Sequence, residues 1–208
     1  MDEMLNELLV GIPESTANLQ LPDPQLRQYY LDQQDRIYWV DDEINDSLLE
    51  LVKMIIRCNK EDVGKPVEDR KPVKVFISSP GGETQAMWSA MQAIQTSKTP
   101  VWTINFSYCY SAAAELLVAG HKRFALKGST TMIHRGSCFI GGEQSVVEST
   151  QKYMKAMEQK YQDFLLSHTK IDQKTYRKRA SADMYFTEYE ALESGIVDVV
   201  VENFEEIF

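Results

Sequence analysis

Short apolar runs alternate with segments of helical periodicity along most of this chain. Runs rich in β-branched and aromatic residues predict strands, and apolar residues that recur every three or four positions predict helices. Strands alternating with helices indicate an α/β fold of βαβ units with right-handed crossovers. The predicted strands are 36–40, 73–78, 101–106, 124–126, 130–134 and 196–201, and the predicted helices follow Ser47, cover 87–94, 111–118 and 143–168, and follow Thr187.

The same pattern suggests how the chain is organised. Residues 1–35 are polar and contain three prolines, so we expect an N-terminal arm or partner-contact segment, followed by a single domain over 36–208. A helix over 143–168 would be about 39 Å long at ~1.5 Å per residue, which favours a projecting helix that packs against another copy of the chain. Capping boxes are predicted at Ser47-x-x-Glu50 and Thr187-x-x-Glu190.

Composition narrows the function classes. The 208 residues are 43% hydrophobic and 25% charged, with a net charge of −9, so no general attraction to nucleic acid or to an anionic membrane is expected. No apolar run approaches the roughly 20 residues of a membrane helix, and no signal peptide is predicted. The three cysteines are scattered without metal-binding spacing, which predicts reduced thiols in a cytoplasmic protein and no metal site.

Ser111 is the first candidate for chemistry, because it lies where an apolar strand gives way to an alanine-rich segment. Serine is a favoured N-cap residue, so a capping role is one interpretation. In the other, a strand-to-helix corner exposes the hydroxyl as a nucleophile, and the amide of Ala112 faces a developing oxyanion. The residues alone leave both interpretations open.

Two further segments carry suitable chemistry. The turn SPGG at 79–82 is either a tight turn that needs glycine or a backbone brought close to a substrate, with the Gly82 amide as a second oxyanion donor. His134 ends the apolar run TTMIH, where it is either structural or the general base for Ser111. Neither segment is decisive alone.

The order of these segments resembles the proteolytic subunit of the Clp protease, the ClpP family of serine peptidases. The resemblance runs from about Arg36 to Glu202. It is carried by VFISSPGGETQAMWSAMQAI, SYCYSAAAELLVAGHKRFAL, TTMIHRG and FTEYEALESGIVDVVVE.

This resemblance implies the crotonase-like ClpP fold with a protruding handle helix at about 143–168. It also implies Ser111 as nucleophile, His134 as general base, and the amides of Gly82 and Ala112 as the oxyanion hole. Further implications are heptameric rings stacked into a tetradecamer, an ATP-dependent unfoldase as partner, unfolded polypeptide as substrate, and no cofactor.

The sequence also departs from the family. Arg179 stands where the family has the aspartate that orients the histidine, and loss of such an acid can cost about 10⁴ in rate. Asp183, or with less support Asp172, could supply the carboxylate as a third member. Alternatively, a backbone carbonyl orients the imidazole, or the chain is an inactive member of a mixed ring. Glu115 occupies a position that is usually apolar in the family, where it could pair across a subunit contact.

Other functions stay open as alternatives. A catalytically weak or inactive structural subunit of a mixed ring follows from Arg179. An acyl-coenzyme A enzyme would share the fold and the oxyanion hole, although its resemblance in the Ser and His segments is weaker. A Ser–Lys peptidase would use Lys122 or Lys127, two lysines predicted to lie in a solvated turn.

Overall fold

The computed structural model describes residues 24–136, 140–179 and 182–208. Backbone contacts divide the chain into Met1–Asp35 and Arg36–Phe208. In the first unit, helix α2 spans Pro24–Asp35, within the segment predicted to be a polar arm. The second unit contains β1 (Ile37–Val40), α3 (Leu49–Glu61), β2 (Val73–Ser79), α4 (Thr84–Thr96), β3 (Val101–Tyr110), α5 (Ala112–Val118), β4 (Lys122–Leu126), β5 (Thr130–Ile133), α6 (Gln144–His168), α7 (Gln173–Arg179), β6 (Met184–Thr187), α8 (Glu188–Glu193) and β7 (Val199–Val201).

The second unit is built on one sheet, which confirms the predicted α/β class. Strands β1, β2, β3, β4 and β7 are parallel neighbours in that order. The ten-residue strand β3 has two partners on one side: its first half pairs with β4 and its second half with β5. Strand β6 then pairs with β5 in antiparallel fashion. The length of β3 therefore brings a second small group of strands to its carboxyl end.

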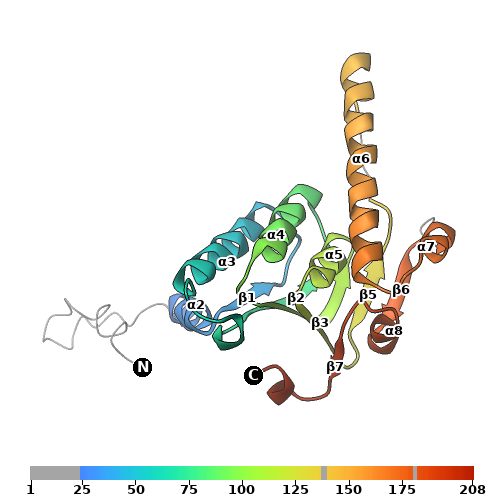
Figure 1. Cartoon of the computed structure of the whole chain (residues 1–208). Helices are drawn as coiled ribbons and strands as arrows, with labels where there is room; N and C mark the ends of the chain where they lie inside the picture. Colours follow the sequence, from blue (N-terminus) through green and yellow to red (C-terminus); the bar gives the residue numbers. More distant parts are fainter. Residues whose placement is uncertain (1–23, 137–139, 180–181) are drawn as a thin grey trace, which may run out of the picture. The chain divides into compact units, whose positions relative to one another are not determined.

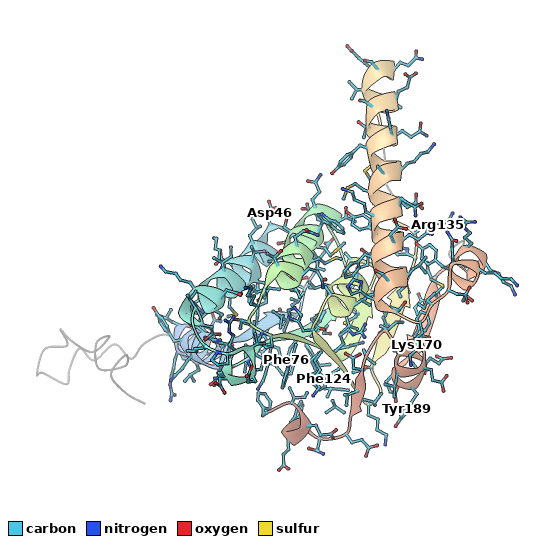
Figure 2. All side chains as sticks on the ribbon, in the orientation of Figure 1. Asp46, Phe76, Phe124, Arg135, Lys170 and Tyr189 are labelled. Carbon is cyan, nitrogen blue, oxygen red and sulfur yellow. The ribbon has the colours of Figure 1, made fainter. Side chains whose placement is uncertain are left out.

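Two apolar clusters cover the two faces of the sheet. The larger cluster packs the sheet against α3, α4 and α5, with residues such as Leu51, Met91 and Leu117 fully buried. The smaller cluster lies on the opposite face and is centred on Phe76, Ile104 and Phe124. Figure 2 shows the labelled side chains of Phe76 and Phe124 on the side of the sheet away from these helices.

Helix α6 extends away from the sheet in the second unit (Figure 1), as predicted for 143–168. Among its 25 residues only Leu165 is buried. No helix in the described ranges combines the length and apolar character needed to cross a membrane.

Several local predictions need correction. The capping box at Ser47 is wrong: Asn45 accepts a hydrogen bond from the Ser47 amide, and α3 begins at Leu49 without a side-chain cap. The box at Thr187 and Glu190 is confirmed at the start of α8. The final strand is shorter than predicted, and the segments that form α2, α7 and β6 were not predicted, because short or polar elements leave little periodic signal.

Candidate active site

Ser111 lies at the corner between β3 and α5, in a strained conformation. Its backbone has φ +56° and ψ −124°, which is unusual for a residue other than glycine and costs on the order of 1–3 kcal/mol. The Ser111 amide donates to the carbonyl of Met132 at 2.9 Å, which ties the corner to β5. Although Ser111 occupies the N-cap position, its side chain makes no capping hydrogen bond. The hydroxyl is therefore available to another partner.

That partner is His134. Its Nε2 atom lies 2.7 Å from Ser111 Oγ, well within hydrogen-bond distance. The parallel pairing of β3 with β5 explains this contact. Tyr110, the last residue of β3, is paired with Met132 near the end of β5. Ser111 and His134 follow these two strand ends and are therefore close together. The imidazole can accept the hydroxyl proton when Nε2 is unprotonated and Nδ1 carries the hydrogen.

Asp183 lies on the other side of the imidazole. In the antiparallel β5–β6 pair, Ile133 is opposite Met184. Asp183, just before β6, therefore lies beside His134, just after β5. Asp183 Oδ1 is 3.6 Å from His134 Nδ1, a distance suited to an ion pair with protonated histidine but long for a hydrogen bond. The Asp183 side chain is 50% exposed, against 29% for His134.

The other residues considered for the third position are placed differently. Asp172 is engaged at the start of α7, where its carboxylate accepts hydrogen bonds from the amide and hydroxyl of Thr175, both at 2.8 Å. The Thr175 amide bond lowers the pKa of Asp172 from its ordinary value. Arg179 is the last residue of α7, and its side chain lies outside the described part of the structure.

The SPGG turn lies directly against the Ser111 corner. A Cβ atom on Gly81 would lie 2.8 Å from Ser111 Cβ and 3.0 Å from the Ala112 nitrogen, so glycine is needed for this approach. At Gly82, φ is +146° and an added Cβ would collide with the backbone of Ile44. In the described part of the chain, no hydrogen bond is found for the amide of Gly82 or of Ala112. In this part of the chain both amides lack a partner, that of Ala112 directly after Ser111 and that of Gly82 in the adjoining turn.

The remaining basic candidates have other contacts. Lys122 Nζ lies 5.0 Å from the Trp102 ring centroid, and Lys127 pairs with Glu202 at 3.3 Å, which is against a Ser–Lys arrangement. His121 Nδ1 accepts a hydrogen bond from the Val101 amide at 2.9 Å. Within the described ranges, no group of three or more His, Cys, Asp or Glu side chains is arranged to hold a metal ion.

The two tyrosines that precede Ser111 pack away from α5. Cys109 belongs to the helix-facing core, and its neighbours alternate to the other face of the strand. There Tyr108 and Tyr110 have ring centroids 5.1 Å apart, and Tyr110 meets Tyr185 edge to face. The Tyr110 hydroxyl is 3.0 Å from Thr130 Oγ1.

Glu115 is the feature of the site that sequence reasoning weighed least. Its Oε2 atom is buried and has no hydrogen-bond partner among the described residues. This burial raises the pKa of Glu115 to about 7. The signal in the sequence is one acid inside an otherwise apolar helix, AAAELLV.

Comparisons with known proteins agree on one family. The family model described as Clp protease matches residues 30–204. The chain is 27% identical over 197 residues to the ATP-dependent Clp protease proteolytic subunit 2 of Treponema denticola, covering 93% of this chain and 94% of that protein. It is 30% identical to proteolytic subunit 1 of Bifidobacterium longum (82% of this chain, 72% of that protein) and to proteolytic subunit 2 of Frankia casuarinae (80% and 76%).

Proposed function

The chain belongs to the Clp protease family and is a serine-type peptidase of ClpP type, and on this premise we propose that Ser111 is its nucleophile and His134 its general base. The observation that carries this proposal is the 2.7 Å contact between Ser111 Oγ and His134 Nε2. A nucleophile and base within hydrogen-bond reach, with a third group behind the base, are typical of activated serine. The strained corner supports the assignment, since strain of this kind clusters at functional sites.

The reaction follows from this geometry. Ser111 Oγ attacks the peptide carbonyl carbon while its proton passes to His134 Nε2. The negative oxygen of the tetrahedral intermediate accepts hydrogen bonds from the amides of Gly82 and Ala112. The C–N bond then breaks as His134 returns the proton to the departing amine, leaving an acyl group on Ser111. Water hydrolyses this acyl-enzyme with His134 again acting as base, so the subunit needs no cofactor.

Asp183 acts as the third member in this proposal. A carboxylate near Nδ1 keeps the imidazole in the tautomer that leaves Nε2 unprotonated, and it stabilises the imidazolium. The distance of 3.6 Å and the half-exposed side chain indicate a weaker partner than a buried, hydrogen-bonded aspartate. We expect Asp183 to support catalysis despite Arg179 at the family's usual aspartate position.

Assembly is the next part of the proposal. The relatives are named as proteolytic subunits of ATP-dependent proteases. For this chain we propose heptameric rings stacked into a tetradecamer in the cytoplasm, which enclose the active sites and receive unfolded polypeptide from an ATP-dependent unfoldase. Helix α6 supports this assembly, because a 25-residue helix with one buried residue has most of its surface left for another copy. Sedimentation of the purified chain tests it, with the mass of fourteen subunits expected and a monomer as the contrary result.

Hydrolysis of fluorogenic peptides by the assembled protein tests the catalytic assignment. Wild type is compared with Ser111→Ala and with Ser107→Ala, a matched serine four residues earlier on β3. We expect activity to disappear in the Ser111 variant and to persist in the control. Equal rates for wild type and Ser111→Ala would instead favour the catalytically inactive, structural subunit, which the close Ser111–His134 contact does not favour.

A further inference from the structure

One carboxylate oxygen of Glu115 lacks a hydrogen-bond donor among the described residues. Its Oε2 atom is shielded from solvent without a donor in the described chain, although the helix around it is apolar and closely packed. A buried acceptor without a partner is destabilising by about 1–3 kcal/mol, and more for a charged group, so native proteins seldom keep one. An acid retained in this state suggests that its donor arrives with a ligand.

The position of Glu115 relates it directly to the nucleophile. The Glu115 amide donates to the Ser111 carbonyl at 3.3 Å across the first turn of α5. Residues four apart lie on the same helix face, about 6 Å apart along the axis, and long helical side chains lean toward the N-terminus. The carboxylate is therefore on the face of α5 that carries Ser111 and leans toward that residue.

Three helices supply the surroundings of this acid. Burial raises the pKa of Tyr161 of α6 and of Tyr176 of α7, and the charge of Glu115 raises both further, so both rings are within electrostatic range of this acid. Tyr161 also meets Trp88 of α4 edge to face, with centroids 5.2 Å apart. The acid is thus beside aromatic rings that can pack along a long aliphatic chain.

The nearby charges do not neutralise Glu115. Arg135 is a cation near Tyr176, and its positive charge lowers the pKa of that tyrosine. The Arg135 guanidinium already pairs with Glu158 of α6 at 3.7 Å. Figure 2 shows Arg135 beside α6. Tyr153, Tyr161, Tyr176, Arg135 and Glu158 are therefore the titratable and charged neighbours to consider, and none of them donates a hydrogen bond to Oε2 of Glu115 in the described chain. A positive group with hydrogen-bond donors is the missing partner.

We propose that Glu115 selects substrates with lysine or arginine on the acyl side of the cleaved bond, by pairing with that basic side chain. This inference rests on the proposed role of Ser111, because the acyl-side residue is the one whose carbonyl carbon Ser111 attacks. The ammonium or guanidinium supplies both the donor and the charge that Oε2 lacks. Its methylene chain packs along Tyr161 and Trp88, as such chains do along apolar surface. An apolar substrate side chain leaves the buried carboxylate unpaired.

Peptide pairs that differ only at the acyl-side residue test this inference. Values of kcat/KM are measured for lysine, arginine and leucine peptides with wild type, Glu115→Gln, Glu115→Leu and the control Glu50→Gln, a surface acid paired with Lys53. We expect both Glu115 variants to lower the ratio of basic to leucine cleavage by about ten- to a hundredfold, the usual contribution of a charged hydrogen bond. The control should keep the wild-type ratio.

The same ratio gives a second readout through pH. The pKa of Glu115 near 7 implies that its ionised fraction rises about tenfold between pH 6 and 8, and kcat/KM reports groups of the free enzyme. The basic-to-leucine ratio of the wild type should rise by close to that factor. Any other group that affects the cleavage of both peptides equally cancels in the ratio. The ratio of the Glu115→Gln variant should be flat over this range.

The outcomes separate this inference from the proposed function. If cleavage requires Ser111 but the ratio is unchanged in Glu115→Gln and Glu115→Leu, the inference is overturned while the catalytic assignment stands. It is also overturned if these variants change the sedimenting mass without changing the ratio, because Glu115 then pairs with another copy. If Ser111→Ala cleaves as fast as wild type, the proposed function itself fails.

Discussion

Two acids in this molecule with buried carboxylate oxygens, Asp62 and Glu115, have opposite environments. The Asp62 carboxylate accepts hydrogen bonds from Arg36 at 2.6 Å, Lys65 at 2.9 Å and Thr99 at 3.0 Å. The Arg36 hydrogen bonds hold the pKa of Asp62 well below its usual range. Oε2 of Glu115 has no such donor among the residues that the structure describes, and burial alone raises the pKa of Glu115 to about 7. One acid is fully paired within the chain, and the other is left with an unmet acceptor.

The location of the two acids shows what the difference means. Arg36 and Thr99 precede β1 and β3, so the Asp62 network joins the amino ends of parallel strands. Glu115 follows Ser111 beyond the carboxyl end of β3. Open parallel sheets bind ligands at the carboxyl ends of their strands. The paired acid therefore holds the framework together, while Glu115 and the strained serine lie at the end of the sheet where such folds bind ligands.

The largest expected effect is at Ser111, beyond the carboxyl end of β3, where a substitution should abolish catalysis without lowering stability. Ser111→Ala should reduce peptide hydrolysis by at least about a thousandfold, because no other group replaces the nucleophile. The melting temperature should stay within a few degrees of wild type, since the hydroxyl is not part of the core. Peptide assays and calorimetry on the same preparation measure both. A large loss of stability with proportional loss of activity would contradict the distinction between the two regions.

At Asp62, near the amino ends of β1 and β3, we expect a large loss of stability and little change in peptide cleavage. Asp62→Asn should destabilise the fold by about 3–5 kcal/mol, because it removes the buried carboxylate that pairs with Arg36 and leaves the half-exposed Glu61 as the remaining counter-charge. The protein that remains folded should cleave peptides normally. Urea unfolding followed by tryptophan fluorescence gives the free energy of unfolding. Glu68→Gln, at an exposed position in the short 3-10 helix Val67–Asp69, serves as a control that should change this free energy little.

Asp183→Asn tests how the imidazole is oriented. We expect kcat to fall by about a hundredfold, less than the ~10⁴ known for a buried, hydrogen-bonded aspartate, because this carboxylate is half exposed and 3.6 Å away. Asp172→Asn should leave kcat near wild type while weakening α7. If the Asp172 variant loses kcat and the Asp183 variant does not, the assignment of the third member is wrong.

The smallest effect is a pH-dependent gain in stability at Glu115. The carboxyl has an ordinary pKa of 4.5 when unfolded and about 7 when folded, so the folded state favours the protonated form. Its favourable contribution is complete below about pH 4.5 and is lost as pH rises through 7. Glu115→Gln should therefore match wild type at pH 4 and exceed it by about 3 kcal/mol at pH 8. Equal unfolding curves at pH 8 would show that Glu115 already has a partner.

The fold and part of the site could be predicted from sequence because they depend on local signals. The strand that leads to Ser111, the SPGG turn and the apolar run before His134 each carry a recognisable pattern, and their order identified the family. The placement of Asp183 was harder, because β6 is short and its register with β5 is fixed by tertiary pairing. The positive φ of Ser111 and the missing partner of Glu115 depend on how α5, α6 and α7 pack, which periodicity does not specify.

The most direct measurement of the central claim is adduct mapping with a fluorophosphonate, which phosphonylates activated serines. The assembled protein is incubated with the reagent, digested and analysed by mass spectrometry. We predict a single adduct on Ser111, formed much more slowly in His134→Ala and unchanged in the control His168→Ala, whose imidazole lies at the end of α6. Absence of an adduct on Ser111, under conditions that label a related Clp proteolytic subunit, would contradict the account.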